Sequence, residues 1–318
     1  MNWDTAIALA LGIATGLALL VLLASLACFL RVFYSPKRKV LGENEYELPR
    51  GRVYEPYHEQ MRGWMKQIRT LPHEDMEITS FDGLTLRGKY YHYRDGAPIE
   101  ILFHGYRGNS ERDLCGSVER CFALERNALI VDQRAGGRSD GHIITFGVRE
   151  RLDVLRWVDH VISRFGGDVK IILTGISMGA STVILASAEP LPDNVKCILA
   201  DCGYSSAKEI ICKVVQKIGL RVKIVYPLIR LGARLYGHFD PEDASPIDTI
   251  RQTKIPVILI HGETDDFVPW EMGRDMFEAC GSEKKFVSVP NAGHGVAYMA
   301  DIEGYLRAVR EFDEVCGL

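Results

Sequence analysis

The chain begins with an unbroken apolar run and then changes to short alternating segments. Residues 5–30 contain no charged side chain and consist mostly of Ala, Leu, Ile and Val. About 20 such residues are enough for a helix to cross the hydrocarbon core of a bilayer. A cleaved secretory signal needs a positive start and a shorter apolar stretch, but the only charged residue before this run is Asp4. We therefore predict a retained N-terminal transmembrane anchor over residues 1–34.

Basic residues flank this run on one side only. Arg31, Lys37, Arg38 and Lys39 follow it, and no Lys or Arg precedes it. The positive-inside rule places such a flank in the cytoplasm. Seven scattered cysteines outside the run, without C-x-x-C pairs, also favour reduced thiols over a disulfide framework. We expect a single-pass protein of the cell membrane whose globular domain is cytoplasmic.

The next 38 residues, 35–72, are polar and punctuated by prolines. We interpret them as a tether followed by a covering helix over residues 55–69. Alternating segments at 74–81 and 84–93 then flank Asp82-Gly83, a turn signal that predicts a β-hairpin.

From residue 99 onward, short apolar strands alternate with helical segments. This alternation predicts a mostly parallel sheet with helices on both faces, hence the α/β class. With the hairpin, the sheet has eight strands. The stretch 205–253 is too long for a simple crossover, so we predict a small helical lid insertion there. The other predicted strands are 99–103, 128–132, 169–174, 196–200, 256–260 and 285–289, and the helices are 111–125, 148–165, one after 177, and 296–312.

Composition excludes some classes of function. The 318 residues are 47% hydrophobic and carry a formal net charge of −4, with no basic stripe that would bind nucleic acid. The nine histidines are dispersed, without H-x-H or H-x-x-x-H spacing, so we predict no metal site. We also predict no cofactor. The oligomeric state is not determined by the sequence.

One predicted strand runs into a motif that can present a nucleophile. Gly175-Ile176-Ser177-Met178-Gly179 follows an apolar stretch and precedes a helical one. The two glycines lack the Cβ atoms that would clash in a strained strand-to-helix turn, so Ser177 can expose its Oγ. G-x-S-x-G is common by chance. Asp265 and His294 follow later strands, however. The order Ser, acid, His along the chain narrows the choice of fold and reaction class, because other triad enzymes have other orders.

These residues suit acyl transfer. His294 would act as the base for Ser177, and Asp265 would orient the imidazole. Asp266 is a rival for the role of the acid because it is adjacent to Asp265. Asp201 is a second rival because it comes at the end of the strand 196–200.

The developing oxyanion needs two amide donors. We assign these to the backbone N–H groups of Met178, which follows the nucleophile, and Tyr106, in the glycine-containing loop 103–109. No substrate-binding residue is identified from the sequence.

Taken together, these motifs resemble the α/β-hydrolases, in particular the serine aminopeptidase-like and prolyl-oligopeptidase-like esterases of bacteria, which include membrane-anchored members. The resemblance extends from about residue 76 to the end. It implies an α/β-hydrolase domain over 73–318 and a Ser177, Asp265 and His294 triad, but no particular substrate. The family usually has Gly-His-Gly where this chain has Ala135-Gly136-Gly137. The matching pieces are 103–109, 132–139, 175–179, 261–265 and 292–294.

We therefore expect a serine hydrolase that cleaves carboxylic esters with a small or medium acyl group, lipid-derived if the anchor holds it at a bilayer. The alternatives are a peptidase or aminopeptidase-like amide hydrolase and a non-catalytic, membrane-tethered binding protein. Within the insertion, the apolar residues from 224 to 229 either line an acyl pocket or pack as a helix face. Its basic residues either contact lipid headgroups or form a solvated face.

Overall fold

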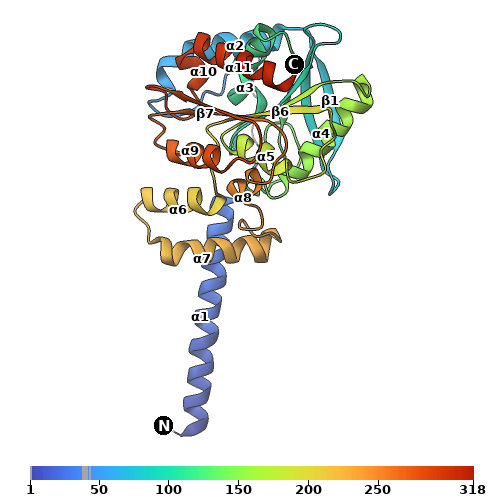
Figure 1. The fold of residues 1–318 in the computed structure, drawn as a ribbon. Coiled ribbons are helices and arrows are strands. Elements are labelled where there is room, and N and C mark those ends of the chain that lie inside the picture. Colours follow the sequence, from blue (N-terminus) through green and yellow to red (C-terminus); the bar gives the residue numbers. More distant parts are fainter. Residues whose placement is uncertain (1, 38–41, 43) are drawn as a thin grey trace.

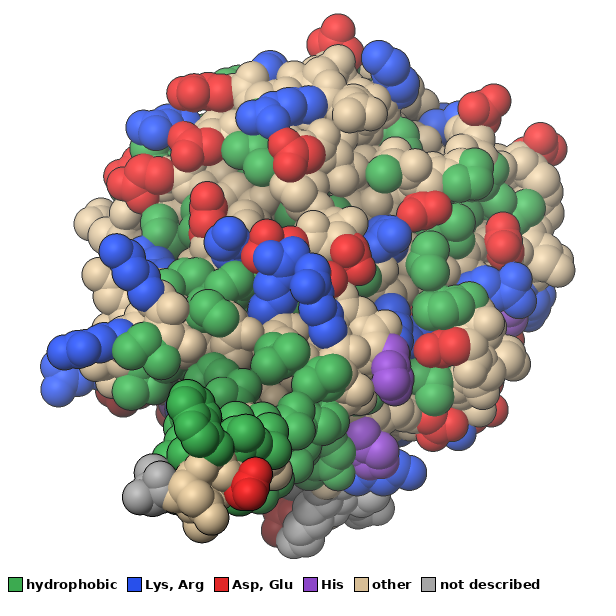
Figure 2. All heavy atoms as spheres, turned by 90° about the horizontal axis from the view of Figure 1, so that it is seen from below, with side chains coloured by type: hydrophobic (Ala, Val, Ile, Leu, Met, Phe, Trp, Pro, Cys, Tyr) green, Lys and Arg blue, Asp and Glu red, His purple; other side chains and the backbone are tan. Residues whose placement is uncertain are grey.

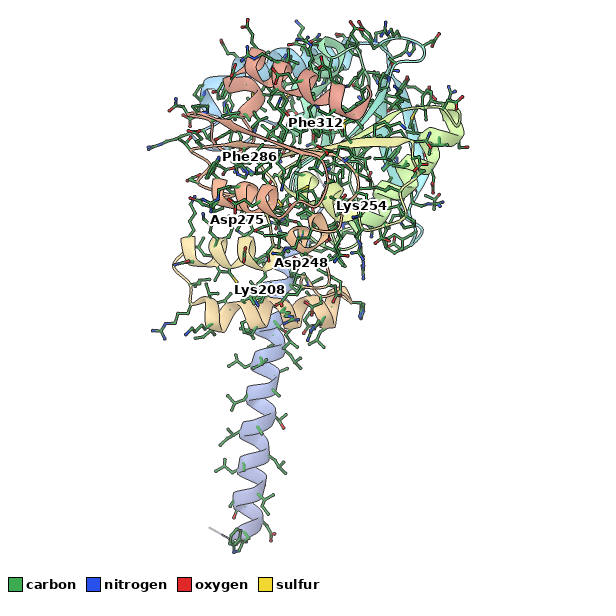
Figure 3. All side chains as sticks on the ribbon, viewed as in Figure 1. Lys208, Asp248, Lys254, Asp275, Phe286 and Phe312 are labelled. Carbon is green, nitrogen blue, oxygen red and sulfur yellow. The ribbon has the colours of Figure 1, made fainter. Side chains whose placement is uncertain are left out.

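The apolar run forms a single helix, α1 (Trp3–Val32), which projects from the rest of the molecule in the computed structural model (Figure 1). The structure describes residues 2–37, 42 and 44–318. Along most of α1 the side chains point outward without a neighbouring element (Figure 3), and the helix is long and apolar enough to cross a membrane. Arg38 and Lys39, two of the four residues of the predicted basic flank, lie outside the described residues.

The sheet has eight strands in the order β1-β2-β4-β3-β5-β6-β7-β8. β2 pairs antiparallel with β1 and with β4, and all other pairs are parallel. The predicted eight-stranded, mostly parallel sheet is therefore confirmed. Its strands are β1 (Glu74–Thr79), β2 (Thr85–Tyr91), β3 (Ile99–Phe103), β4 (Asn127–Asp132), β5 (Ile171–Ile176), β6 (Val195–Asp201), β7 (Val257–Gly262) and β8 (Lys284–Val289).

Helices cover both faces of the sheet. Its central strands are therefore buried at nearly every position. One face carries α2 (His58–Thr70), α3 (Ser110–Ala123), α10 (Ala297–Ala300) and α11 (Ile302–Cys316) (Figure 1). The other carries α4 (Glu150–Phe165), α5 (Met178–Ala186), α8 (Pro246–Ile250) and α9 (Trp270–Ala279). α5 is buried along its whole length.

Three helices differ from the prediction. The closing helix is divided into α10 and α11, because the side chain of Asp301 accepts a hydrogen bond from Gly304 N (2.9 Å) and caps a new helix. α2 is preceded by a 3₁₀ turn, η1 (Glu55–Tyr57). α9 was not predicted. It contains Gly273, where an added Cβ would lie 2.4 Å from the His261 ring, so contact with β7 places a poor helix former inside this helix.

The insertion is helical, as predicted, and comprises α6 (Ala207–Lys217), α7 (Val222–Gly232), the π-helical turn η2 (Ala233–Gly237) and α8. α7 runs across α1 (Figure 1). Gly232 permits this crossing, because a Cβ there would lie 2.3 Å from the Ser25 carbonyl oxygen.

Two glycines give a matched test of how the turn after β5 is packed. A Cβ on Gly179 would lie 2.0 Å from the Phe103 carbonyl oxygen, whereas one on the exposed Gly63 of α2 would meet nothing within 4 Å. We expect Gly179→Ala to destabilise the fold by roughly 3 kcal/mol or more, since β3 and α5 must separate. Gly63→Ala should instead stabilise it by up to about 1 kcal/mol. Thermal unfolding of the detergent-solubilised protein measures both, and equal midpoints would contradict this account of the turn.

Candidate active site

Ser177 occupies a strained turn between β5 and α5. Its φ and ψ are 55° and −118°, a conformation that costs a non-glycine residue free energy and persists only where the surroundings impose it. The turn is held by the Ser177 amide, which donates to the Asp201 carbonyl oxygen at 2.8 Å. An added Cβ on Gly175 would lie 2.1 Å from the Gly179 backbone, so the close approach requires glycine. The predicted elbow geometry is thus present at Ser177.

A hydrogen-bond chain links three of the predicted residues. His294 lies in the loop between β8 and α10, and its Nε2 is 2.9 Å from Ser177 Oγ. The other ring nitrogen, Nδ1, is 2.7 Å from Asp265 Oδ2, in the loop after β7. Because the carboxyl ends of neighbouring parallel strands share one sheet edge, residues distant in the sequence meet here. The arrangement allows His294 to take a proton from Ser177 while Asp265 stabilises the imidazolium.

The surroundings of Asp265 keep its carboxylate charged. Burial alone would raise the pKa of Asp265, but hydrogen bonds and charge from His261 and His294 outweigh it and lower the pKa below its usual range. The amides of Phe267 and Val268 both donate to Oδ1 at 2.9 Å. His261, whose Nε2 lies 3.5 Å from Asp265 Oδ2, is a neighbour that sequence reasoning did not assign to the site.

The two rival acids lie elsewhere. Asp266 points to solvent with its side chain 80% exposed, and it pairs with Lys217 at 2.9 Å. Asp201 is buried and accepts a hydrogen bond from the Tyr305 hydroxyl at 3.2 Å. Neither carboxylate is within hydrogen-bond distance of His294 among the contacts of the described residues. The structure therefore places Asp265 alone of the three against the imidazole.

Asp201 gives a prediction about pH. Burial raises its pKa to about 6, so the folded chain holds this proton more tightly than the unfolded chain does. Protonated Asp201 contributes to the stability of the folded protein. This contribution is fully present below the pKa of the unfolded chain and is lost as the pH rises through about 6. Above pH 6, Asp201→Asn should therefore be more stable than the parent by roughly 1–3 kcal/mol and unfold at a higher temperature. It should still hydrolyse substrate.

The measurement is the thermal midpoint of both proteins between pH 4 and pH 8. Asp153, whose pKa is also raised to about 6, is present in both proteins and cancels from the difference. A difference that does not change with pH would contradict the proposed ionisation, and loss of hydrolysis in Asp201→Asn would reopen the choice of acid.

The predicted oxyanion donors lie on either side of Ser177. Met178 is the first residue of α5, where amide groups lack helical partners and favour negative charge. The loop after β3 approaches from the other side, since a Cβ on Gly105 would lie 3.5 Å from Ser177 Cβ. Neither Met178 N nor Tyr106 N donates to another residue in the part of the chain that the structure describes. Both amides remain our proposed donors.

Two side chains hold this loop, the partly buried Asp113 and the buried His104. Asp113, in the first turn of α3, accepts a hydrogen bond from Gly105 N at 3.1 Å. His104 Nε2 accepts one from Gln133 N at 3.0 Å and so fastens the loop to the end of β4. Asp113 is not among the site residues predicted from the sequence. The sequence signal that could have identified it is an acidic residue in the first turn of the helix that follows the glycine-containing loop after a strand.

The cavity at Ser177 has a volume of about 900 Å³ and is lined by Ser177, His294 and the Gly105–Tyr106 loop. It is also lined by residues 49–54, 56 and 57 and by Trp64 of α2, all in the segment predicted to be a tether and covering helix. Sequence reasoning did not assign this segment to the site, because no local pattern marks a chain segment that packs over a distant loop.

For the apolar residues 224–229, the structure favours the helix face over the acyl pocket. Among the described residues that line the cavity, only Lys217 comes from the insertion. Tyr226 and Ile229 of α7 are instead buried in a cluster with Phe29 and Phe33, at the end of α1. The apolar face of α7 is thus used to pack against α1.

The site also contains a group with metal-ligand spacing. Within the described residues, the ligand atoms of Cys202, Asp265 and His294 all lie within 4.8 Å of one another. Both ring nitrogens of His294 are already engaged, one with Asp265 and one with Ser177. An ion there would compete with the Ser177 contact, so these residues fit the hydrogen-bond chain better than a metal centre.

Comparisons with known proteins agree with this architecture. No family model matches the chain. The uncharacterized protein YqkD of Bacillus subtilis is 25% identical over 252 residues, which cover 75% of this chain and 80% of YqkD. The Pyrococcus furiosus esterase Pf2001 superposes with a TM-score of 0.65 at 20% identity, covering 89% of this chain and 98% of the esterase.

A third comparison supplies the name of the fold. The α/β-hydrolase GrgF from Penicillium superposes with a TM-score of 0.59 at 18% identity, covering 78% of this chain and all of GrgF, 100%. At such identities the likeness shows the fold alone. The chain has the α/β-hydrolase fold.

Proposed function

We propose that this protein with the α/β-hydrolase fold is a membrane-tethered serine hydrolase of carboxylic esters. The observation that carries the proposal is the hydrogen-bond chain from Ser177 through His294 to Asp265, which starts at a strained turn and opens into a cavity of about 900 Å³. Similarity to an esterase of known structure supports it.

In this proposal, Ser177 Oγ attacks the ester carbonyl carbon as His294 Nε2 removes its proton. Asp265 stabilises the imidazolium, and the amides of Met178 and Tyr106 stabilise the oxyanion. Collapse of the tetrahedral intermediate breaks the bond to the alcohol, which leaves with the proton from His294. Water then attacks the acyl-enzyme by the same route and releases the acid and free Ser177.

Substrate comparison tests the reaction class. We expect the full-length protein in lipid nanodiscs to hydrolyse p-nitrophenyl butyrate and to react with a fluorophosphonate probe, which requires an activated serine. Aminoacyl-p-nitroanilides should be poor substrates. Faster turnover of the anilides would favour the peptidase alternative. Absence of both labelling and turnover would favour a binding protein on a hydrolase scaffold.

For location, we propose that α1 crosses the cell membrane and that the hydrolase domain is cytoplasmic. Arg31 and Lys37, at the domain end of α1, support this orientation. Protease treatment of intact cells should leave the domain uncut, and digestion should follow only when the membrane is opened. Digestion in intact cells would place the domain outside.

A further inference from the structure

The insertion meets α1 part of the way along the helix. The Tyr236 hydroxyl of η2 donates to the Leu22 carbonyl oxygen at 3.0 Å, and Gly232 of α7 packs against Ser25. Beyond these contacts, Phe29 and Phe33 enter a buried cluster of the domain. α1 therefore has a free part that ends near Leu22 and an embedded part that follows.

The free part has the length of a bilayer core. From Trp3 to Leu22 it has about 20 residues, and at about 1.5 Å per residue it extends about 30 Å. That length equals the hydrocarbon thickness of a typical membrane, about 30 Å. If α1 spans the membrane, the contact with η2 and α7 marks the level where hydrocarbon gives way to headgroups.

At that level the insertion exposes apolar side chains. Ile218, Leu220, Ile224 and Leu235 are 64%, 50%, 57% and 42% exposed. Ile218, Leu220 and Ile224 fall within seven residues of the chain, and grouped exposure of large aliphatic side chains is unfavourable in water. Viewed from below, hydrophobic side chains gather around α1, with Lys and Arg beside them (Figure 2).

Two basic residues lie among these apolar ones. Arg221 and Lys223 are exposed, and neither forms an ion pair with any residue that the structure describes. Lys208, Arg230 and Arg234 of the same insertion are, by contrast, paired with acids. Free cations beside exposed aliphatic side chains are typical of a helix that lies in a membrane interface.

We propose that residues 218–237, which we call the collar, form a second membrane-contact surface that lies in the headgroup layer around α1. The apolar side chains insert among the acyl chains, and Arg221 and Lys223 bind the phosphates of anionic lipids. The proposal rests on the membrane tethering by α1 proposed above. The collar orients the domain as well as holding it, because a single helix leaves rotation and tilt free. Lys217, directly before the collar, is one of the residues that line the Ser177 cavity, so the collar adjoins one edge of the cavity.

Two positions with equal exposure provide the test. Ile224 in the collar and Val315 near the C-terminus are 57% and 56% exposed, and the C-terminus lies on the opposite side of the domain from α1 (Figure 1). Ile224→Cys and Val315→Cys are prepared in the full chain and reconstituted in nanodiscs holding one chain each. Labelling rates with a charged, membrane-impermeant maleimide are measured, and the parent's own cysteine background is subtracted.

The collar should be shielded by lipid. We expect Ile224→Cys to react at least about tenfold more slowly than Val315→Cys, because an inserted side chain is inaccessible to a charged reagent. Equal rates would overturn the proposal. Protection that appears only when nanodiscs hold several chains each would identify a second copy of the chain as the partner and would also overturn it.

Lipid charge tests the role of the basic residues. Phosphatidylglycerol should strengthen the protection at Ile224→Cys relative to phosphatidylcholine alone. Replacing Arg221 and Lys223 by Gln should weaken it by about fivefold per residue, which corresponds to about 1 kcal/mol for each cation near an anionic surface. No response to either change would overturn the anionic-lipid contact.

Failure of the collar is distinguishable from failure of the proposed function. The same samples are assayed with p-nitrophenyl butyrate, which needs no membrane. If α1 does not anchor the chain, the protein fails to co-purify with nanodiscs. If only the collar is wrong, the chain co-purifies and hydrolyses the ester, but Ile224→Cys labels freely.

Discussion

Replacing Ser177 with alanine is expected to reduce ester hydrolysis by roughly 10⁴–10⁶-fold. In the proposed mechanism, Ser177 is the residue of the hydrogen-bonded trio with His294 and Asp265 that forms the acyl-enzyme. The fold should persist. Serine and alanine suffer similar strain at a φ of 55°, and the Ser177 hydroxyl bonds only to His294 among the described residues. Turnover of p-nitrophenyl butyrate and labelling by a fluorophosphonate probe both measure the loss.

Ser187→Ala is the matched control. This serine directly follows α5, at the opposite end of the helix from Ser177, and its hydroxyl donates to the Ile184 carbonyl oxygen at 2.7 Å. Its removal should leave turnover and labelling close to the parent values. If Ser177→Ala kept parental turnover while Ser187→Ala lost it, the nucleophile would have been assigned to the wrong serine.

The second large effect is expected at Asp265. Asp265→Asn should lower kcat by about 10⁴-fold, because an amide cannot stabilise the imidazolium and favours the wrong tautomer of His294. The adjacent Asp266→Asn should change kcat little, since Asp266 only pairs with Lys217 at the surface. Steady-state hydrolysis of p-nitrophenyl butyrate compares the pair.

The comparison has a clear negative outcome. A loss in Asp266→Asn as large as that in Asp265→Asn would mean that the loop after β7 rearranges on binding substrate. Parental activity in Asp265→Asn would remove Asp265 from the proposed triad. In that case Asp201→Asn, prepared for the pH experiment, would show whether the buried acid after β6 takes its place.

Much of the candidate site could be predicted because its signals are local. Ser177 was identified from a strand followed by glycines at two fixed offsets, and His294 and Asp265 from their positions after later strands. The structure adds the physical difference between Asp265 and its neighbour Asp266. Adjacent residues in a loop differ in direction, and only the fold shows that one is buried against His294 while the other faces solvent.

The cavity wall could not be predicted. Residues 49–57 reach the site by packing over a loop more than 200 residues away in the chain, at Gly293. An added Cβ on Gly293 would lie 2.2 Å from Val53, which shows how closely this segment packs over the His294 loop. Such packing depends on shape and leaves no periodic pattern in either segment.

By itself, the sequence determined the eight-stranded sheet, the turn at Ser177 and the long apolar helix, because hydrophobic periodicity and glycine placement act over a few neighbouring residues. Only the tertiary structure decided where the insertion packs. The apolar face of α7 could have covered an acyl pocket or another helix. It covers α1, because Gly232 allows close approach at Ser25 and because Tyr226 and Ile229 are buried there with Phe29 and Phe33. A hydrophobic face shows that it needs a partner, and the choice of partner depends on complementary shape between segments distant in the chain.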